Sequence, residues 1–173
     1  GSLFDEEYYR TGWGDVPYSR SEPRWIVFFG MVADQLIRSL RPRQVLDVGC
    51  ALGFLVEACW DRGVGAQGID VSEFAIANVR RDMVRHCRVA SAAEGIEGRF
   101  DLITCIEVLE HMPEEEANRA IRSMTSATET ILFSSTPYDH EEPTHFNIRP
   151  TLAWLHLFQE QGFSPDVDFD ASF

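Results

Sequence analysis

Apolar residues follow two alternating patterns along the chain. Continuous runs at 44–49 and 100–106 are typical of buried parallel strands, whereas apolar positions three or four residues apart over 25–40 predict a helix. The same patterns predict strands over 65–70, 87–90 and 130–134, helices over 52–62, 73–84, 114–126 and 151–161, and a last extended piece ending near residue 170. Strands that alternate with helices favour an α/β fold, namely a doubly wound, mostly parallel sheet with helices on both faces.

The length of 173 residues suits a single domain with a sizeable core. Residues 3–43 are predicted to be an N-terminal helical arm that covers the sheet, and residues 44–173 the ligand-binding part. The first part of the arm, 3–24, is rich in aromatic residues, glycine and proline, which predicts an irregular lid. Its Tyr18 and Arg20 either reach a bound ligand or only help to cover the sheet.

Charge and cysteine content exclude several kinds of partner. The net charge is −13, and residues 100–173 carry 14 acids against 3 arginines, so the surface would repel a nucleic-acid backbone. No stretch approaches the roughly 18 apolar residues of a membrane span. The four cysteines form no C-x-x-C pair and are predicted to be reduced core residues. We therefore expect a cytoplasmic protein that binds a small molecule, with no nucleic acid and no membrane as partner.

A glycine turn links the strand at 44–49 to the following helix. The turn reads Gly49-Cys50-Ala51-Leu52-Gly53, and the next strand ends in Asp70, an acid that could hold ribose hydroxyls. Only the first glycine of a G-x-G-x-x-G pattern is present, which argues against a dinucleotide. Asp47, two residues before that glycine, could orient the turn or receive an ammonium group, as a cofactor with an amino-acid tail requires.

Three segments together, VLDVGC-x-x-G, GID and FDLITCIEVLEHM, resemble the S-adenosylmethionine-dependent methyltransferases with a Rossmann-like fold, over residues 44 to about 165. The resemblance implies that Gly49, Cys50 and Gly53 line the methionine and adenosine, and that Asp70 holds the ribose. The other residues it brings to the cofactor are Ala51, Val71, Ser91, Ala92 and Glu107.

The resemblance also implies a seventh, antiparallel strand at the end of the fold. The sequence stops at residue 173, just after the predicted sixth strand, so we expect this last antiparallel strand to be missing and the chain to be cut from a longer polypeptide. The edge of the fifth strand would then be unpaired, unless residues 165–171 pair there.

Catalytic chemistry is predicted at Glu107, Glu110 and His111, which would share one face of a helical turn. The loop over 138–150 adds His140 and His145. Two carboxylates and one or two imidazoles would suit a divalent ion, Mg²⁺, Mn²⁺ or Zn²⁺. The segment is similar to that of the small-RNA and ubiquinone-pathway O-methyltransferases, where it is associated with metal-assisted O-methylation; this implies Glu107, Glu110, His111 and His145 as ligands.

Two further interpretations of this segment stay open: a metal-free general base, His111 or His145, or no direct role in catalysis. The function we expect is O-methylation of a small-molecule or sugar hydroxyl. PYSRSEPRW in the arm and STP…EPTHFNIRP resemble a bacterial subgroup associated with polysaccharide biosynthesis, which implies a sugar acceptor and either a homodimer or a parent polypeptide with a glycosyltransferase.

Two other functions remain as alternatives to O-methylation. One is a non-catalytic, degenerate or truncated domain that still binds the cofactor or a partner enzyme. The other is an NAD(P)-dependent oxidoreductase, which the glycine pattern disfavours.

Overall fold

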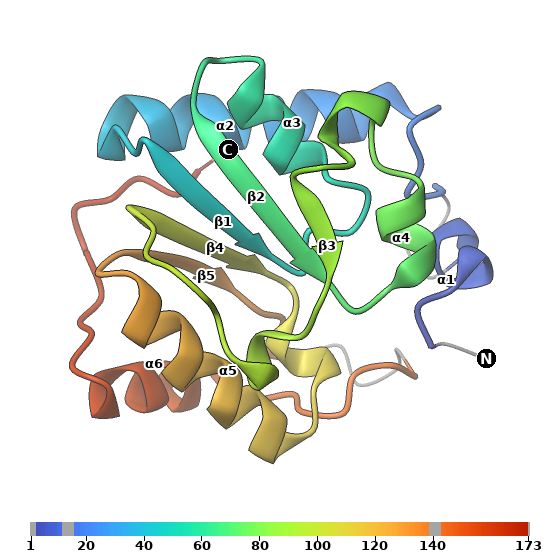
Figure 1. Cartoon of the computed structure of the whole chain (residues 1–173). Helices are drawn as coiled ribbons and strands as arrows, with labels where there is room; N and C mark the ends of the chain where they lie inside the picture. Colours follow the sequence, from blue (N-terminus) through green and yellow to red (C-terminus); the bar gives the residue numbers. More distant parts are fainter. Residues whose placement is uncertain (1–2, 12–15, 139–142, 173) are drawn as a thin grey trace.

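The computed structural model describes residues 3–11, 16–138 and 143–172, and it confirms the predicted doubly wound α/β fold. Figure 1 shows a central sheet with α2 and α3 on one face and α5 and α6 on the other. The strands are β1 (Gln44–Val48), β2 (Gly65–Asp70), β3 (Cys87–Val89), β4 (Leu102–Ile106) and β5 (Ile131–Ser134). They lie in the order β3-β2-β1-β4-β5, and every pair of neighbours is parallel.

The strand order indicates where a ligand site is expected. The chain moves outward from β1 to β2 and β3, then returns to pair β4 on the other side of β1. Ligands of open α/β sheets bind where this reversal occurs, at the carboxyl ends of the strands. In the register of the sheet, Val48 lies between Ile69 and Cys105, so the residues that follow these three strands are neighbours in space.

In the described residues, six helices and three short 3-10 turns connect the strands or cover the sheet. The helices are α1 (Glu6–Thr11), α2 (Pro23–Leu40), α3 (Phe54–Trp60), α4 (Glu73–Ala77), α5 (Glu114–Ala127) and α6 (Thr151–Glu160). The 3-10 turns are η1 (Arg81–Met83), η2 (Ala92–Glu94) and η3 (Leu109–His111). In the part of the chain that the structure describes, no helix is long and apolar enough to cross a membrane.

Among the described residues, one apolar cluster lies on each face of the sheet, and a third joins Tyr9 and Tyr18 to Leu52 and Phe54. Val45 of β1 packs with Leu36 and Leu55 on the side of α2 and α3. Leu46, the next residue, packs with Ile121 and Trp154 on the side of α5 and α6. Both faces of the strands are therefore buried, which explains why β1 and β4 appear in the sequence as continuous apolar runs.

Two predicted elements differ in the structure. The arm is not irregular throughout, because Glu6–Thr11 form α1. The single helix predicted over 73–84 is instead α4 followed by η1. Between them Arg80 forms an ion pair with Asp61 at the end of α3, at 2.6 Å, so the chain turns and Met83 reaches the core without a continuous helix.

The predicted extended piece over 163–170 is not a strand, and residues 165–171 form no ladder with β5. Pro165 has no N–H to donate to a ladder. Phe163 and Phe169 instead pack against the two core clusters, and the Gln35 side chain donates to the Asp170 carbonyl at 3.0 Å. This segment is thus held by aromatic contacts and one hydrogen bond rather than by strand pairing.

Candidate active site

A cavity of about 680 Å³ opens at the carboxyl edge of the sheet. Nine of the ten residues predicted to hold the cofactor line it: Asp47, Gly49, Cys50, Ala51, Asp70, Val71, Ser91, Ala92 and Glu107. The tenth, Gly53, is absent from the lining. It adopts a φ of 72° at the start of α3, a conformation that glycine tolerates and that allows the backbone to pass from the turn into the helix.

The glycine turn, residues 49–53, brings backbone groups to the cavity wall. Gly49 has a φ of 73°, and a Cβ at this position would lie 2.3 Å from Cγ2 of Val108, so only glycine fits. Ala51 adopts a φ of 46° and donates its N–H to Asp70 at 2.8 Å. The turn keeps the expected shape, although an alanine in this region costs about 1 kcal/mol.

Asp70 forms hydrogen bonds with residues that follow β1 and β2. Its Oδ2 accepts the N–H of Ala51 and its Oδ1 accepts the N–H of Ser72, both at 2.8 Å. Each carboxylate oxygen retains a second lone pair that a ribose hydroxyl could use. Burial raises the pKa of Asp70, while these backbone donors oppose the shift.

Asp47 is a second acid of the cavity wall. It is only 6% exposed, and its Oδ1 accepts a hydrogen bond from the Thr104 hydroxyl at 2.7 Å. Burial raises its pKa to about 7, and the neighbouring carboxylate of Asp70 adds to the shift. A cationic ligand group beside Asp47 would favour its charged form, as the predicted ammonium contact requires.

Eight aromatic residues also line the cavity: Phe4, Tyr8, Tyr9, Tyr18, Trp25, Phe28, Phe29 and Phe146. Tyr18 therefore lies at the cavity, as one of the two open interpretations of the arm expects. Arg20 is not among the lining residues and forms an ion pair with Glu57 instead. No arginine occurs in the described lining, and the chain has no lysine, so the charged groups there are acids and one histidine.

The segment after β4 differs from the predicted helical turn. Glu107 has a φ of 53° and precedes η3, so it does not share a helical face with Glu110 and His111. Its Oε1 accepts a hydrogen bond from the Ser134 hydroxyl at 2.7 Å, and it lines the cavity. A residue other than glycine held in this left-handed conformation is strained, which is common at functional sites.

Glu110 lies behind the cavity rather than in its lining. The residue is completely buried, and its Oε2 has no hydrogen-bond partner among the described residues. Burial, with a hydrogen bond to the nearby Glu107 carboxylate as the second cause, raises the pKa of Glu110 to about 8. Glu110 is therefore mostly protonated at neutral pH unless a cation approaches it.

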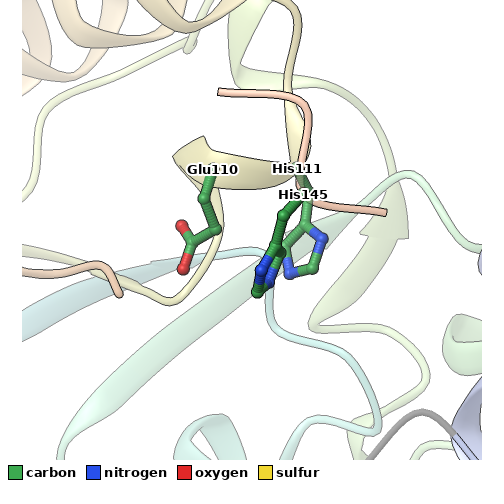
Figure 2. A group of neighbouring side chains, drawn as sticks. All are labelled: Glu110, His111 and His145. Atoms are coloured by element: carbon green, nitrogen blue, oxygen red, sulfur yellow. The ribbon is translucent and has the colours of Figure 1, made fainter. Parts of the chain in front are cut away.

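His111 lines the cavity and stands next to a loop that is distant in sequence. Its Nδ1 lies 3.2 Å from the carbonyl oxygen of Thr144 and 3.0 Å from the Thr144 hydroxyl. The His145 ring centre is 4.6 Å from that of His111. Figure 2 shows Glu110, His111 and His145 projecting to the same side of η3.

These three side chains could hold a metal ion. Each offers one ligand atom, and the three atoms lie within 4.8 Å of one another. Two imidazoles and one carboxylate are a donor set that suits Mn²⁺ or Zn²⁺ better than Mg²⁺, and the unpartnered oxygen of Glu110 fits a ligand role. Glu107 is not in this group, so the structure brings together three of the four predicted ligands. His140, the other predicted histidine, lies outside the described residues.

Comparison with known proteins decides the family. Residues 29–166 match the family model described as a methyltransferase domain. The chain belongs to this family.

Solved structures share the fold of this methyltransferase domain. The magnesium protoporphyrin IX methyltransferase of Synechocystis PCC 6803 with bound S-adenosylhomocysteine aligns over 91% of the domain and 87% of its own chain, with a TM-score of 0.66 and 19% identity. The same enzyme has a structure with bound S-adenosylmethionine, with a TM-score of 0.63 and 21% identity. These similarities establish the fold as that of the class I S-adenosylmethionine-dependent methyltransferases.

Curated relatives match the methyltransferase domain over shorter segments. The ubiquinone biosynthesis O-methyltransferase of Pseudomonas aeruginosa is 37% identical over 83 residues, or 43% of this chain and 36% of the relative. That of Pseudomonas entomophila is 34% identical over 106 residues, or 56% of this chain and 46% of the relative. The matches thus span less than half the length of these relatives.

Several residues of the site were not predicted. Thr144 and the arm residues Phe4, Tyr8 and Tyr9 lie at or beside the cavity, although none of them was singled out as a site residue. The aromatic composition of the arm is the signal that could have found the last three. Thr144 carries no such signal.

Proposed function

We propose that this methyltransferase domain binds S-adenosylmethionine in the cavity and transfers its methyl group to a hydroxyl oxygen. The observation that carries the proposal is that His111 lines the same cavity as the glycine turn and Asp70. A proton acceptor and a nucleoside-type site thus face one space. A hydroxyl acceptor needs such a group, because its proton must leave as the oxygen is methylated.

The cofactor is proposed to bind with its amino group at Asp47 and its ribose at Asp70. Its methionine part would lie against the backbone of Gly49 to Ala51, and its adenine against Ser91 and Ala92. The acidic, arginine-free lining supports this arrangement, because the sulfonium and the ammonium of the cofactor outweigh its one carboxylate and leave it with a net positive charge. The cavity of about 680 Å³ is of the size found for small-molecule sites.

The proposed step is an in-line displacement. The acceptor oxygen attacks the methyl carbon, the carbon–sulfur bond breaks, and its electron pair stays on sulfur, giving neutral S-adenosylhomocysteine. The hydroxyl proton goes to His111. The step needs the tautomer in which Nδ1 of His111 carries the ring proton and donates it to the carbonyl or the hydroxyl of Thr144, at 3.2 and 3.0 Å, while Nε2 acts as the base.

A second candidate is metal-assisted transfer. Glu110, His111 and His145 would hold a divalent ion, favoured by the closeness of their ligand atoms and by the unpartnered buried oxygen of Glu110. The ion would supply Lewis-acid polarisation of the acceptor oxygen. Sensitivity of methyl transfer to a chelator distinguishes this candidate from a metal-free base.

The acceptor we propose is an uncharged small molecule, including a sugar, with a free hydroxyl. The aromatic wall can stack on a planar ring or on the apolar face of a sugar. A phosphorylated or carboxylated acceptor would meet the acids Asp47, Asp70, Glu107 and Glu116 without a cationic partner in the described lining. Such an anion would lose its hydration with no compensating charge.

Transfer of a labelled methyl group from S-adenosylmethionine tests the proposal. The acceptor panel contains catechols, free hexoses and hexose phosphates, each with and without EDTA. Labelling of a neutral hydroxyl compound supports the proposal, and its loss with EDTA selects the metal-assisted form. Cofactor binding without labelling of any member would favour a non-catalytic binding domain.

A further inference from the structure

The N-terminal arm, residues 3–11 and 16–25, borders both ends of the cavity. Tyr9 and Tyr18 are buried in one cluster with residues of the glycine turn. At the other end, the ring centres of Phe4 and Tyr8 lie 5.6 and 6.3 Å from that of His111. The position of the arm therefore decides the shape of the space where cofactor and acceptor would meet.

An ion pair between the partly exposed Arg20 and the buried Glu57 attaches the arm to α3. Nη2 of Arg20 lies 2.9 Å from Oε1 and 2.8 Å from Oε2 of Glu57, and its guanidinium carbon lies 5.2 Å from the Phe54 ring centre. The Glu57 side chain is only 5% exposed. The backbone N–H of Glu57 donates to the carbonyl of Gly53, so Glu57 lies one helical turn after the last residue of the glycine turn.

Arg20 is the main partner of this buried carboxylate. Arg80 also approaches Glu57, but only to 4.0 Å, and it is engaged with Asp61 at 2.6 Å and Asp82 at 2.7 Å. Burial raises the pKa of Glu57, and the charge of Arg20 opposes this shift most strongly. A buried carboxylate is costly unless it is paired, so the fold depends on keeping Arg20 in this place.

A second attachment lies at the start of the arm. The Ser72 hydroxyl donates to the carbonyl of Phe4 at 2.5 Å. Ser72 also donates its N–H to Asp70. These two contacts attach the arm to α3, which follows the glycine turn, and to Ser72, which lies two residues after Asp70.

We infer that Arg20 and Glu57 are positioning residues, whose ion pair holds the arm against α3 so that the aromatic wall is formed before the cofactor binds. Without the pair, part of the binding free energy would be used to order the arm, and the affinity would fall accordingly. The inference rests on the proposed function, because its main probe is S-adenosylhomocysteine.

The test uses a double variant, Arg20→Met with Glu57→Gln. Arg20→Met alone would leave a buried, unpaired carboxylate and destabilise the fold for that reason, whereas the double variant removes both charges. Three quantities are compared with wild type: affinity for S-adenosylhomocysteine by calorimetry, melting temperature, and hydrogen exchange of the Tyr18 amide. This amide donates to the Tyr9 carbonyl at 2.8 Å and so reports on the arm.

The expected result is a melting temperature close to that of wild type, an affinity about tenfold weaker, and faster exchange at Tyr18. Arg10→Ala is the matched control. Arg10 lies on the same arm and pairs with Glu7 at 2.6 Å, but both side chains are more than half exposed, so all three quantities should stay unchanged.

An affinity within about twofold of wild type, with unchanged exchange at Tyr18, would overturn the inference. If wild type itself failed to bind S-adenosylhomocysteine, the proposed function would be contradicted instead. The exchange rate at Tyr18 would then decide the role of the pair alone: faster exchange in the double variant supports it, and an equal rate refutes it.

Discussion

The two ends of the cavity are built in different ways. At the proposed cofactor end, Gly49 and Ala51 adopt left-handed conformations, and their N–H groups donate to the Ile69 carbonyl and the Asp70 carboxylate. The wall at this end is therefore formed mainly by backbone, whose conformation depends on a short stretch of sequence. At the acceptor end, η3 meets residues 144–147, and the N–H groups of Phe146 and Asn147 both donate to the carbonyl of Glu110.

This difference indicates where substitutions should act. A backbone wall tolerates few side-chain changes at the glycine turn, whereas an acceptor end built from distant segments can change its chemistry by single substitutions. Changes at the two ends should therefore separate cofactor binding from methyl transfer.

The largest separation is expected for His111→Ala. Removing the proposed base should lower the rate of methyl transfer about 10²- to 10⁴-fold, while affinity for S-adenosylhomocysteine stays nearly unchanged. Steady-state kinetics and calorimetry measure the two effects. His156→Ala serves as control, because that imidazole is 71% exposed on α6. A rate equal to that of wild type would show that His111 has no chemical role.

Gly49→Ala is expected to disturb the structure at both ends of the cavity. Its Cβ would lie 2.3 Å from Val108 in the segment that leads to His111, so S-adenosylhomocysteine affinity should fall by about 100-fold. Gly63→Ala is a matched control, because Gly63 has a similar φ of 78° but no atom within 4 Å of the added Cβ. If both variants bind S-adenosylhomocysteine equally well, the close approach of Val108 to residue 49 does not affect this affinity.

Asp47→Asn should remove the pH dependence of the affinity for S-adenosylhomocysteine. Burial raises the pKa of Asp47 from 3.8 to about 7, so the affinity of wild type for S-adenosylhomocysteine should rise as pH increases through 7. The variant should show no such rise and bind about tenfold more weakly at pH 8. A parallel pH profile in both proteins would contradict an ammonium contact at Asp47.

The same substitution has a predicted effect on stability. A raised pKa means that the folded state holds an additional proton between about pH 4 and pH 7, so unfolding free energy falls as pH rises over this range. Asp47→Asn should flatten this fall in urea titrations of the ligand-free domain. Glu110, with a pKa of about 8, contributes its own fall in both proteins, so only the difference between them is informative.

The smallest effect is expected for Ala51→Gly. Glycine adopts the left-handed conformation without strain, so unfolding free energy should increase by about 0.5–1 kcal/mol. Cofactor affinity should change little, because the N–H donated to Asp70 is retained. A loss of stability would show that the methyl group of Ala51 contributes more by packing than it costs in strain.

Local sequence was sufficient to predict the cavity wall that carries the glycine turn and Asp70. The apolar run over 44–48, the glycine turn and Asp70 lie within one strand-turn-helix-strand unit, and the structure places them in one wall. The left-handed Glu107, the partner of Arg20 and the contact of His111 with Thr144 could not be predicted, because each depends on tertiary packing between segments far apart in the chain. The segment 163–170 was mistaken for a strand because aromatic anchoring and strand pairing give similar sequence patterns.

The most direct test of cofactor use is a calorimetric titration with S-adenosylhomocysteine, with NAD as control. One site of micromolar affinity for S-adenosylhomocysteine, and no binding of NAD, is the predicted result. Binding of NAD, or of neither compound, would contradict the assignment of this cavity to S-adenosylmethionine.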